Sequence, residues 1–151
     1  APRHIVHASG SGGTQAGLML GAWLHGLDAG IVGINVCDDY DYFAAKTRQD
    51  IDDWQQRYGA AVDWQQLPFS LIDGYVGDGY GQAGQPVLEC IAELARTEGV
   101  ILDPVYTGKA FFGLCQEIRN GRFAGESDLV FIHTGGIYGL YAFRDSIQAV
   151  L

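Results

Sequence analysis

Apolar residues along the chain alternate between short continuous runs and longer stretches with helical spacing. Continuous runs predict buried strands at residues 4–8, 31–37 and 129–133. Helical spacing predicts helices over residues 15–27, 41–58, 86–98 and 107–120. Weaker strand candidates cover residues 60–67 and 100–102. Continuous apolar strands that alternate with helices indicate an α/β fold, with a parallel sheet covered by helices on both faces.

The loops that follow the predicted strands carry the candidate chemistry. Ligands of open parallel sheets bind beyond the carboxyl ends of the strands. The loops expected at that edge are Ser9–Thr14, Leu102–Thr107 and Thr134–Gly136. A further loop, residues 73–84, is rich in glycine and tyrosine and is predicted to be irregular. Long irregular loops in compact domains are often functional, so this loop is a further candidate.

The Ser9–Thr14 loop has the composition of an anion-binding loop. It follows a predicted strand and opens a predicted helix, where free N–H groups and the helix dipole attract an anion. It lacks the lysine of a Walker A loop, and Gln15 stands where a dinucleotide fingerprint needs its third glycine. Asp38, after the second strand, could still bind a ribose, so a non-catalytic, Rossmann-like nucleotide-binding domain stays open. A tight turn without a ligand is the other alternative.

Composition and charge exclude several classes of protein. The chain has 151 residues, enough for one domain with its own core, and a net charge of −9. That charge disfavours nucleic acid and anionic membranes as partners, and no apolar run approaches the roughly 20 residues that span a bilayer. The cysteines and histidines lack metal-ligand spacing, so no metal site is expected. Three widely spaced cysteines indicate reduced thiols and a cytoplasmic location.

Four segments resemble motifs of one enzyme family. They are Ala8–Gly17 (ASGSGGTQAG), Gly79–Gly81 (GYG), Asp103–Ala110 (DPVYTGKA) and Phe131–Gly136 (FIHTGG). Their order and spacing resemble the D-cysteine desulfhydrase and 1-aminocyclopropane-1-carboxylate deaminase group of fold-type II pyridoxal-phosphate enzymes. The resemblance covers nearly the whole chain. It implies the large, cofactor-binding domain of a tryptophan synthase β-like fold.

The resemblance also implies roles for particular residues. Five consecutive loop residues are implied to bind the phosphate of pyridoxal 5'-phosphate: Gly10, Ser11, Gly12, Gly13 and Thr14. Thr134 is implied to face the pyridine nitrogen, where a hydroxyl leaves that nitrogen less firmly protonated than a carboxylate would and makes the ring a weaker electron sink. Tyr80 and Tyr106 are implied to be catalytic residues beside the substrate, because a phenol can orient a carboxylate or relay a proton.

Two positions in these motifs differ between branches of the family. The deaminases resemble one another in having Glu and Leu where this chain has Thr107 and Thr134, whereas desulfhydrase-like members have small hydroxyl residues. The resemblance therefore implies a lyase that performs β-elimination on a cysteine-like amino acid and gives pyruvate, ammonia and sulfide. L-Cysteate, with sulfite as the leaving group, is a related substrate, and a ring-opening 1-aminocyclopropane-1-carboxylate deaminase is the alternative enzyme.

The family's Schiff-base lysine lies in an N-terminal segment without a counterpart in this chain. The only lysines are Lys46 and Lys109, and neither aligns with it. The chain also opens on Ala1, and its one methionine is Met19. We therefore expect residues 1–151 to be the C-terminal, cofactor-binding portion of a longer enzyme and to be inactive without the N-terminal remainder. The resemblance also implies a homodimer that acts on a small amino-acid substrate.

Overall fold

A parallel four-stranded sheet forms the centre of the computed structural model, which describes residues 1–151. The strands are β1 (His4–Ser9), β2 (Gly30–Asn35), β3 (Phe69–Ile72) and β4 (Leu129–Phe131). Their order in the sheet is β3-β2-β1-β4, and every neighbouring pair is parallel. The carboxyl ends of all the strands therefore meet at one edge. The predicted α/β fold with a parallel sheet is confirmed.

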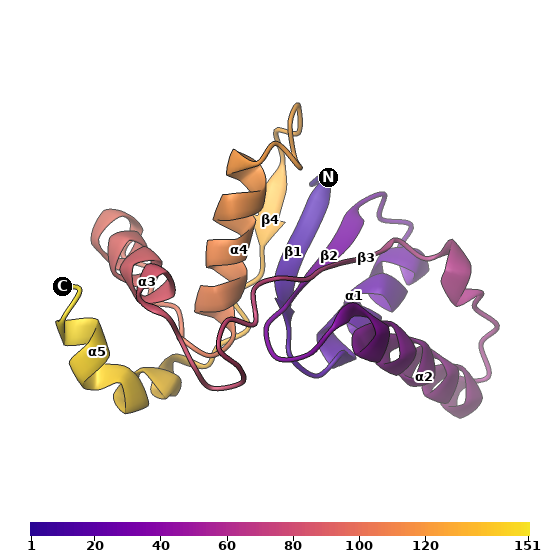
Figure 1. Ribbon diagram of the computed structural model, residues 1–151. Coiled ribbons are helices and arrows are strands. Elements are labelled where there is room, and N and C mark those ends of the chain that lie inside the picture. Colours follow the sequence, from indigo (N-terminus) through magenta and orange to yellow (C-terminus); the bar gives the residue numbers. More distant parts are fainter.

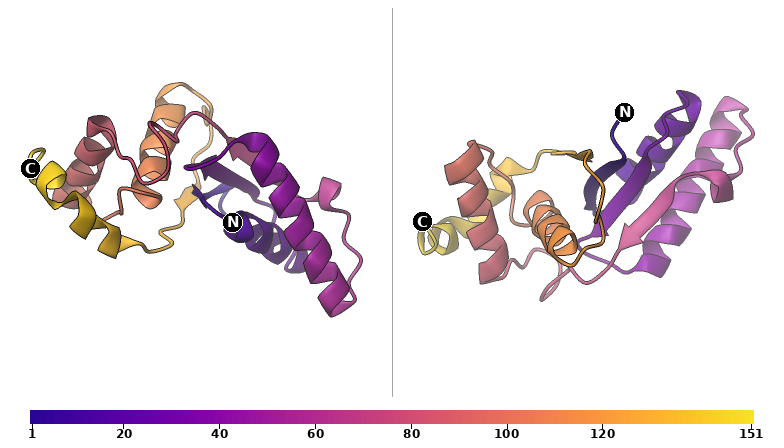
Figure 2. Two further views of the ribbon diagram at one scale, coloured as in Figure 1. Left: turned by 60° about the horizontal axis from the view of Figure 1, so that its bottom comes forward. Right: turned by 90° about the horizontal axis from the view of Figure 1, so that it is seen from above.

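Helices cover both faces of the sheet, as predicted. They are α1 (Gly13–Leu24), α2 (Tyr40–Tyr58), α3 (Gln85–Glu98), α4 (Thr107–Arg119) and the short α5 (Arg144–Gln148). Figure 1 shows α1 and α2 on one side of the sheet and α4 on the other, with α3 and the C-terminal α5 beyond α4. The two views of Figure 2 show the same layering, with the C-terminus far from the sheet.

Alternate residues of the central strands supply two separate hydrophobic cores. Val6 and Val32 point toward α4 and belong to a cluster that also contains Leu114. Ile5 and Ile31 point the other way and pack with the residues of α1 and α2. Because both faces are buried, the strands are apolar at consecutive positions, which explains the continuous runs in the sequence.

Several helix ends follow local signals in the sequence, whereas the start of α1 has neither a side-chain cap nor a proline. Asp39 caps α2 by accepting a hydrogen bond from the Tyr42 N–H at 2.9 Å, and Gly59 ends it in the left-handed conformation. Pro86 lies in the first turn of α3, and Gly99 ends that helix in the same way. In contrast, Gly12 is the N-cap residue of α1, and no side chain caps this helix. The N–H groups of its first turn are therefore left for another partner.

Two of the expected strands do not form. Residues 60–67 are irregular except for a 3-10 turn, η1 (Trp64–Gln66), which the Asp63 side chain caps. The chain joins the sheet only afterwards, at β3, which the apolar pattern missed. Residues 100–102 also lie outside the sheet, and of these only Leu102 is buried. Strand preference depends on a neighbouring strand to pair with, and these two segments have none.

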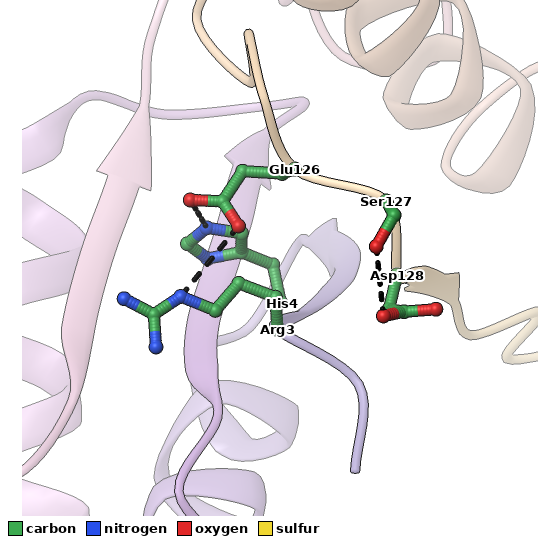
Figure 3. A network of polar contacts seen from close by, with 5 residues as sticks. All are labelled: Arg3, His4, Glu126, Ser127 and Asp128. Carbon is green, nitrogen blue, oxygen red and sulfur yellow. Dashed lines mark hydrogen bonds and ion pairs between the residues drawn. The ribbon is translucent and has the colours of Figure 1, made fainter.

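A polar network ties the amino ends of β1 and β4 together, at the opposite edge from the carboxyl-end loops (Figure 3). Glu126 lies 3.6 Å from Arg3 and 3.8 Å from His4, and the backbone N–H of Arg3 donates to the Asp128 carbonyl at 2.8 Å. Arg3 is largely exposed, so the ion pair contributes less than about 1 kcal/mol. The backbone hydrogen bond from Arg3 to Asp128 extends the pairing of β1 with β4 by one residue.

The structure contains neither a helix suited to cross a membrane nor a cluster of side chains suited to bind a metal ion. None of them combines the length and apolar character that crossing a membrane requires. No group of three or more His, Cys, Asp or Glu side chains is arranged to hold a metal ion.

Candidate cofactor and substrate site

A cavity of about 210 Å³ lies at the carboxyl edge of the sheet. Its walls come from three loops that are far apart in the sequence. The lining residues are Ala8, Gly10, Ser11, Thr14, Tyr106 and Thr134. The loops that follow β1 and β4 thus meet the segment that precedes α4, as expected for the ligand-binding edge of an open parallel sheet.

The glycine loop presents an uncapped helix N-terminus to this edge. Gly12 is the N-cap residue of α1, with φ of +82°, and no side chain caps the helix. The first turn of α1 contains no acidic residue that would compete with an anion. Ser9, only 1% exposed, leaves its hydroxyl buried without a hydrogen-bond partner at the start of the loop. Ser9 does not line the cavity, and the donors that fit a phosphate group are the N–H groups of the first turn of α1 with the Ser11 and Thr14 hydroxyls.

Two of the loop glycines are required by close packing. A Cβ at Gly10 would lie 2.9 Å from the ring of Tyr106, so a side chain there would push the ring aside. A Cβ at Gly12 would lie 2.9 Å from Cγ of Lys46, on α2, and the positive φ at Gly12 already favours glycine. The loop is therefore held between α2 on one side and Tyr106 on the other.

The two tyrosines selected from the sequence meet at the edge of the cavity. The hydroxyls of Tyr80 and Tyr106 share a short hydrogen bond, and the two rings pack edge to face with centroids 5.9 Å apart. The hydrogen bond to Tyr80, together with burial, raises the pKa of Tyr106 to about 12. A hydrogen bond raises the pKa of the group that donates it, so Tyr106 donates its proton to Tyr80 and its own oxygen is left to accept a hydrogen bond.

Replacing Tyr80 by Phe is expected to lower the pKa of Tyr106 from about 12 toward the ordinary value of 10.0. The hydrogen bond with Tyr80 is the largest cause of the raised pKa, so its loss lets Tyr106 ionise at lower pH. Titration of tyrosinate by ultraviolet absorbance measures the shift. Tyr58→Phe, an exposed tyrosine at the end of α2, is the matched control. An unchanged high-pH titration in Tyr80→Phe would contradict the hydrogen bond.

Asp103 is a structural residue of the site that the sequence analysis did not select. It is 1% exposed and accepts hydrogen bonds from the N–H groups of Val105, Tyr106 and Thr107. The Thr107 hydroxyl also donates to it at 2.7 Å. This carboxylate caps α4 and fixes the turn that carries Tyr106. The sequence signal was present, because an aspartate side chain often accepts a hydrogen bond from the backbone N–H two residues further on, as Asp103 does from Val105.

The turn around Asp103 is also joined to the loop after β4. A Cβ at Gly136 would lie 2.9 Å from the Asp103 carboxyl group, so the two segments are in direct contact. Thr134 lies two residues before Gly136, and its exposed side chain lines the cavity. Thr107, by contrast, is fully buried with its hydroxyl bonded to Asp103, and does not line the cavity.

Neither lysine of the chain lines the cavity. Lys46 lies on α2, where its amine forms a short ion pair with Asp50. Lys109 is buried on α4, and its amine donates to the carbonyls of Val76 and Gly79 at 2.6 and 2.9 Å. Both amines are thus engaged with other partners.

The structure brings most of the predicted site residues to one place. Gly10, Ser11, Thr14, Tyr106 and Thr134 line the cavity, and Tyr80 is hydrogen-bonded to Tyr106 at its edge. Gly12 and Gly13 lie in the same loop but are not among the lining residues. Asp38, the residue of the nucleotide-binding alternative, is exposed, accepts a hydrogen bond from the Asp39 N–H and does not line the cavity.

The fold and the site together define an α/β protein with a cavity and an uncapped helix N-terminus at the carboxyl edge of its sheet. Comparison with known proteins shows to which family of α/β proteins the chain belongs. A profile of the family described as "Pyridoxal-phosphate dependent enzyme" matches residues 1–135. The chain therefore belongs to this family of pyridoxal-phosphate dependent enzymes, and the resemblance inferred from the four motifs is confirmed.

Individual relatives point to two activities within the family. The chain is 39% identical over 148 residues to the "Bifunctional D-cysteine desulfhydrase/1-aminocyclopropane-1-carboxylate deaminase, mitochondrial" of Arabidopsis thaliana. It is 36% identical over 145 residues to a D-cysteine desulfhydrase of Yersinia pestis. A crystal structure of an ACC deaminase homologue superposes with a TM-score of 0.86 at 39% sequence identity, which confirms the fold.

These matches cover almost all of this chain but less than half of each relative. They include 97% of this chain and 35% of the Arabidopsis protein, and 95% of this chain and 43% of the Yersinia protein. The crystal structure is covered to 44%, against 99% of this chain. The 151 residues thus correspond to one part of these longer enzymes.

Proposed function

We propose that this chain binds the phosphate of pyridoxal phosphate and forms one wall of the substrate site in a lyase. The proposed reaction is β-elimination on a cysteine-like amino acid, of the D-cysteine desulfhydrase type. The observation that carries the proposal is the convergence of Gly10, Ser11, Thr14, Tyr106 and Thr134 around one cavity, at an uncapped helix N-terminus. The proposed enzyme is a cytoplasmic homodimer, with the dimer taken from the family resemblance.

Each proposed role follows from the chemistry of the side chain or loop. The N–H groups of the first turn of α1, with the Ser11 and Thr14 hydroxyls, bind the phosphate, each hydrogen bond to the charged group contributing about 1.5–3 kcal/mol. Thr134 offers a hydroxyl to the pyridine nitrogen. Tyr106 lies on the cavity wall and orients the substrate through its hydroxyl oxygen. Tyr80, which accepts the Tyr106 proton, fixes that hydroxyl and keeps its own O–H as a donor to the substrate. When bound, pyridoxal phosphate supplies the electron sink for the elimination.

The lysine that carries the cofactor is proposed to come from outside residues 1–151. Lys46 is ion-paired with Asp50, and Lys109 is bonded to the carbonyls of Val76 and Gly79. Neither amine lines the cavity, so neither is proposed for this role. On this proposal the isolated chain binds phosphate esters but does not turn over substrate.

The proposal is tested with the complete protein loaded with pyridoxal phosphate. D-Cysteine, L-cysteate and 1-aminocyclopropane-1-carboxylate are offered in parallel, and sulfide, sulfite, pyruvate and ammonia are measured. Release of sulfide and pyruvate from D-cysteine supports the desulfhydrase. Failure to bind pyridoxal phosphate at all would contradict the proposed site.

The second candidate is a 1-aminocyclopropane-1-carboxylate deaminase, which the names of the Arabidopsis relative and of the similar crystal structure favour. Ammonia released from that substrate alone would assign this activity in place of the desulfhydrase. The non-catalytic nucleotide-binding domain has no comparable support, because the family consists of enzymes and Asp38 does not line the cavity.

Substituting Thr107→Glu together with Thr134→Leu is expected to move activity toward ring opening. Thr134 lines the cavity, whereas Thr107 acts from behind it, through the turn that carries Tyr106. We expect the ratio of ring opening to β-elimination to rise by about tenfold or more, the size of effect that a few pocket contacts produce. Parallel ammonia and sulfide assays of the complete enzyme measure this ratio. Unchanged product ratios in a folded double variant would count against the desulfhydrase assignment.

A further inference from the structure

Lys109 is a buried cation whose position the proposed chemistry does not explain. The residue is 1% exposed, and no carboxylate lies within ion-pair distance of its amine. Burial lowers its pKa, an effect opposed by the nearby Cys37 and Asp78. A buried ammonium is costly unless its donors are satisfied. Here two backbone carbonyls, of Val76 and Gly79, accept those hydrogen bonds.

The two carbonyls belong to the irregular loop of residues 73–84. This segment contains no helix or strand, and several of its glycines have positive φ, Gly79 among them with +132°. Such a backbone has few hydrogen bonds of its own to hold its shape. Within the loop, only Gln82 N–H to the Gly79 carbonyl is a backbone hydrogen bond. Side chains from outside must therefore fix it.

Helix α4 provides these fixing contacts at successive points of the loop. The Tyr75 hydroxyl donates to Glu117 at 2.6 Å, on the C-terminal half of α4. Lys109, in the first turn of α4, bonds to the carbonyls of Val76 and Gly79. Tyr80 is the residue directly after Gly79, and it bonds to Tyr106, at the N-cap of the same helix. The Lys109 contact is thus the one adjacent to Tyr80.

We propose that Lys109 is a positioning residue, whose ammonium clamps the Val76 and Gly79 carbonyls and so holds the Tyr80 hydroxyl against Tyr106 beside the cavity. This inference rests on the proposed function and deepens it, because it assigns the control of the catalytic tyrosine pair to a residue that touches neither substrate nor cofactor.

The test compares Lys109→Met with Tyr80→Phe in the complete protein. Lys109→Met keeps the apolar stem and removes the donors. We expect it to lower the pKa of Tyr106, as Tyr80→Phe does, and this titration needs no cofactor. In the loaded enzyme we expect kcat to fall by about 10- to 100-fold, the cost of a misplaced catalytic group, with cofactor affinity unchanged. Arg57→Met, an exposed cation at the end of α2, is the control.

A double variant shows whether Lys109 acts through Tyr80. If it does, Lys109→Met combined with Tyr80→Phe lowers kcat no further than Tyr80→Phe alone. Additive losses, or an unchanged pKa of Tyr106 in Lys109→Met, overturn the inference. If Lys109→Met does not fold, Lys109→Gln, which keeps an amide donor, takes its place in the same double variant. Failure of the unmodified protein to bind pyridoxal phosphate would instead overturn the proposed function.

Discussion

Replacing Ser11 by Asp is expected to weaken the binding of pyridoxal phosphate to the complete protein by about 100-fold or more. Ser11 lines the cavity in the loop proposed to hold the phosphate, so the substitution places a second negative charge beside the first. Two unit charges about 4 Å apart repel by roughly 4 kcal/mol at an effective dielectric constant near 20, and solvent at this exposed residue reduces that figure. The remainder still corresponds to about two orders of magnitude in affinity.

The neutral variant Ser11→Asn is the matched control for this charge effect. It has nearly the same shape as Asp and is expected to change affinity by less than about tenfold, since it loses at most one hydrogen bond. Equilibrium titration with pyridoxal phosphate measures both variants. Equal affinities for Ser11→Asp and Ser11→Asn would show that the phosphate binds elsewhere.

Replacing Asp103 by Ala is expected to destabilise the complete protein by about 3 kcal/mol. The substitution removes the acceptor for three backbone N–H groups and the Thr107 hydroxyl at a buried helix start. Loss of a helix cap costs about 0.5–2 kcal/mol, and buried donors left without partners add to that cost. Urea unfolding, with the free energy extrapolated to water, measures the change.

The variant Asp103→Asn shows how much of the lost stability comes from the negative charge and how much from the hydrogen bonds that cap α4. Its amide keeps one oxygen acceptor, so we expect about half of the loss seen with Ala. The same variants report on the site, because Tyr106 lies in the turn that Asp103 fixes and Gly136 packs against its carboxyl group. A loss of less than about 1 kcal/mol in Asp103→Ala would mean that the turn has other supports.

The loops that line the cavity could be predicted from the sequence, because each motif is a short continuous segment of the chain. The glycines of residues 10–13, the DPVYTGKA segment and the FIHTGG segment each stand at the end of an apolar run, where a parallel sheet places its ligands. Asp103 was missed because the motif was interpreted through Tyr106 and Thr107, whose side chains carried the family resemblance. Its role appears only when the three N–H groups that it accepts from are seen together.

The two misplaced strands show where a local pattern fails. Residues 100–102 are as apolar as a strand, yet no neighbouring strand pairs with them. β3 was overlooked because Phe69–Ile72 is short and contains Ser70, although its pairing with β2 secures it in the sheet. Pairing partners decide strand formation, and they lie far away in the sequence.

The sequence by itself determined the α/β class, four of the five helices and the family, and it predicted an anion site at the glycine loop. Each of these depends on residues close together in the chain, through periodicity, capping or a continuous motif. Only the tertiary structure decided that Tyr80 meets Tyr106, that Asp103 joins two loops, and that Lys109 is buried under residues 73–84. These contacts span up to 33 residues and arise from the packing of α4 against the sheet, which no local pattern encodes.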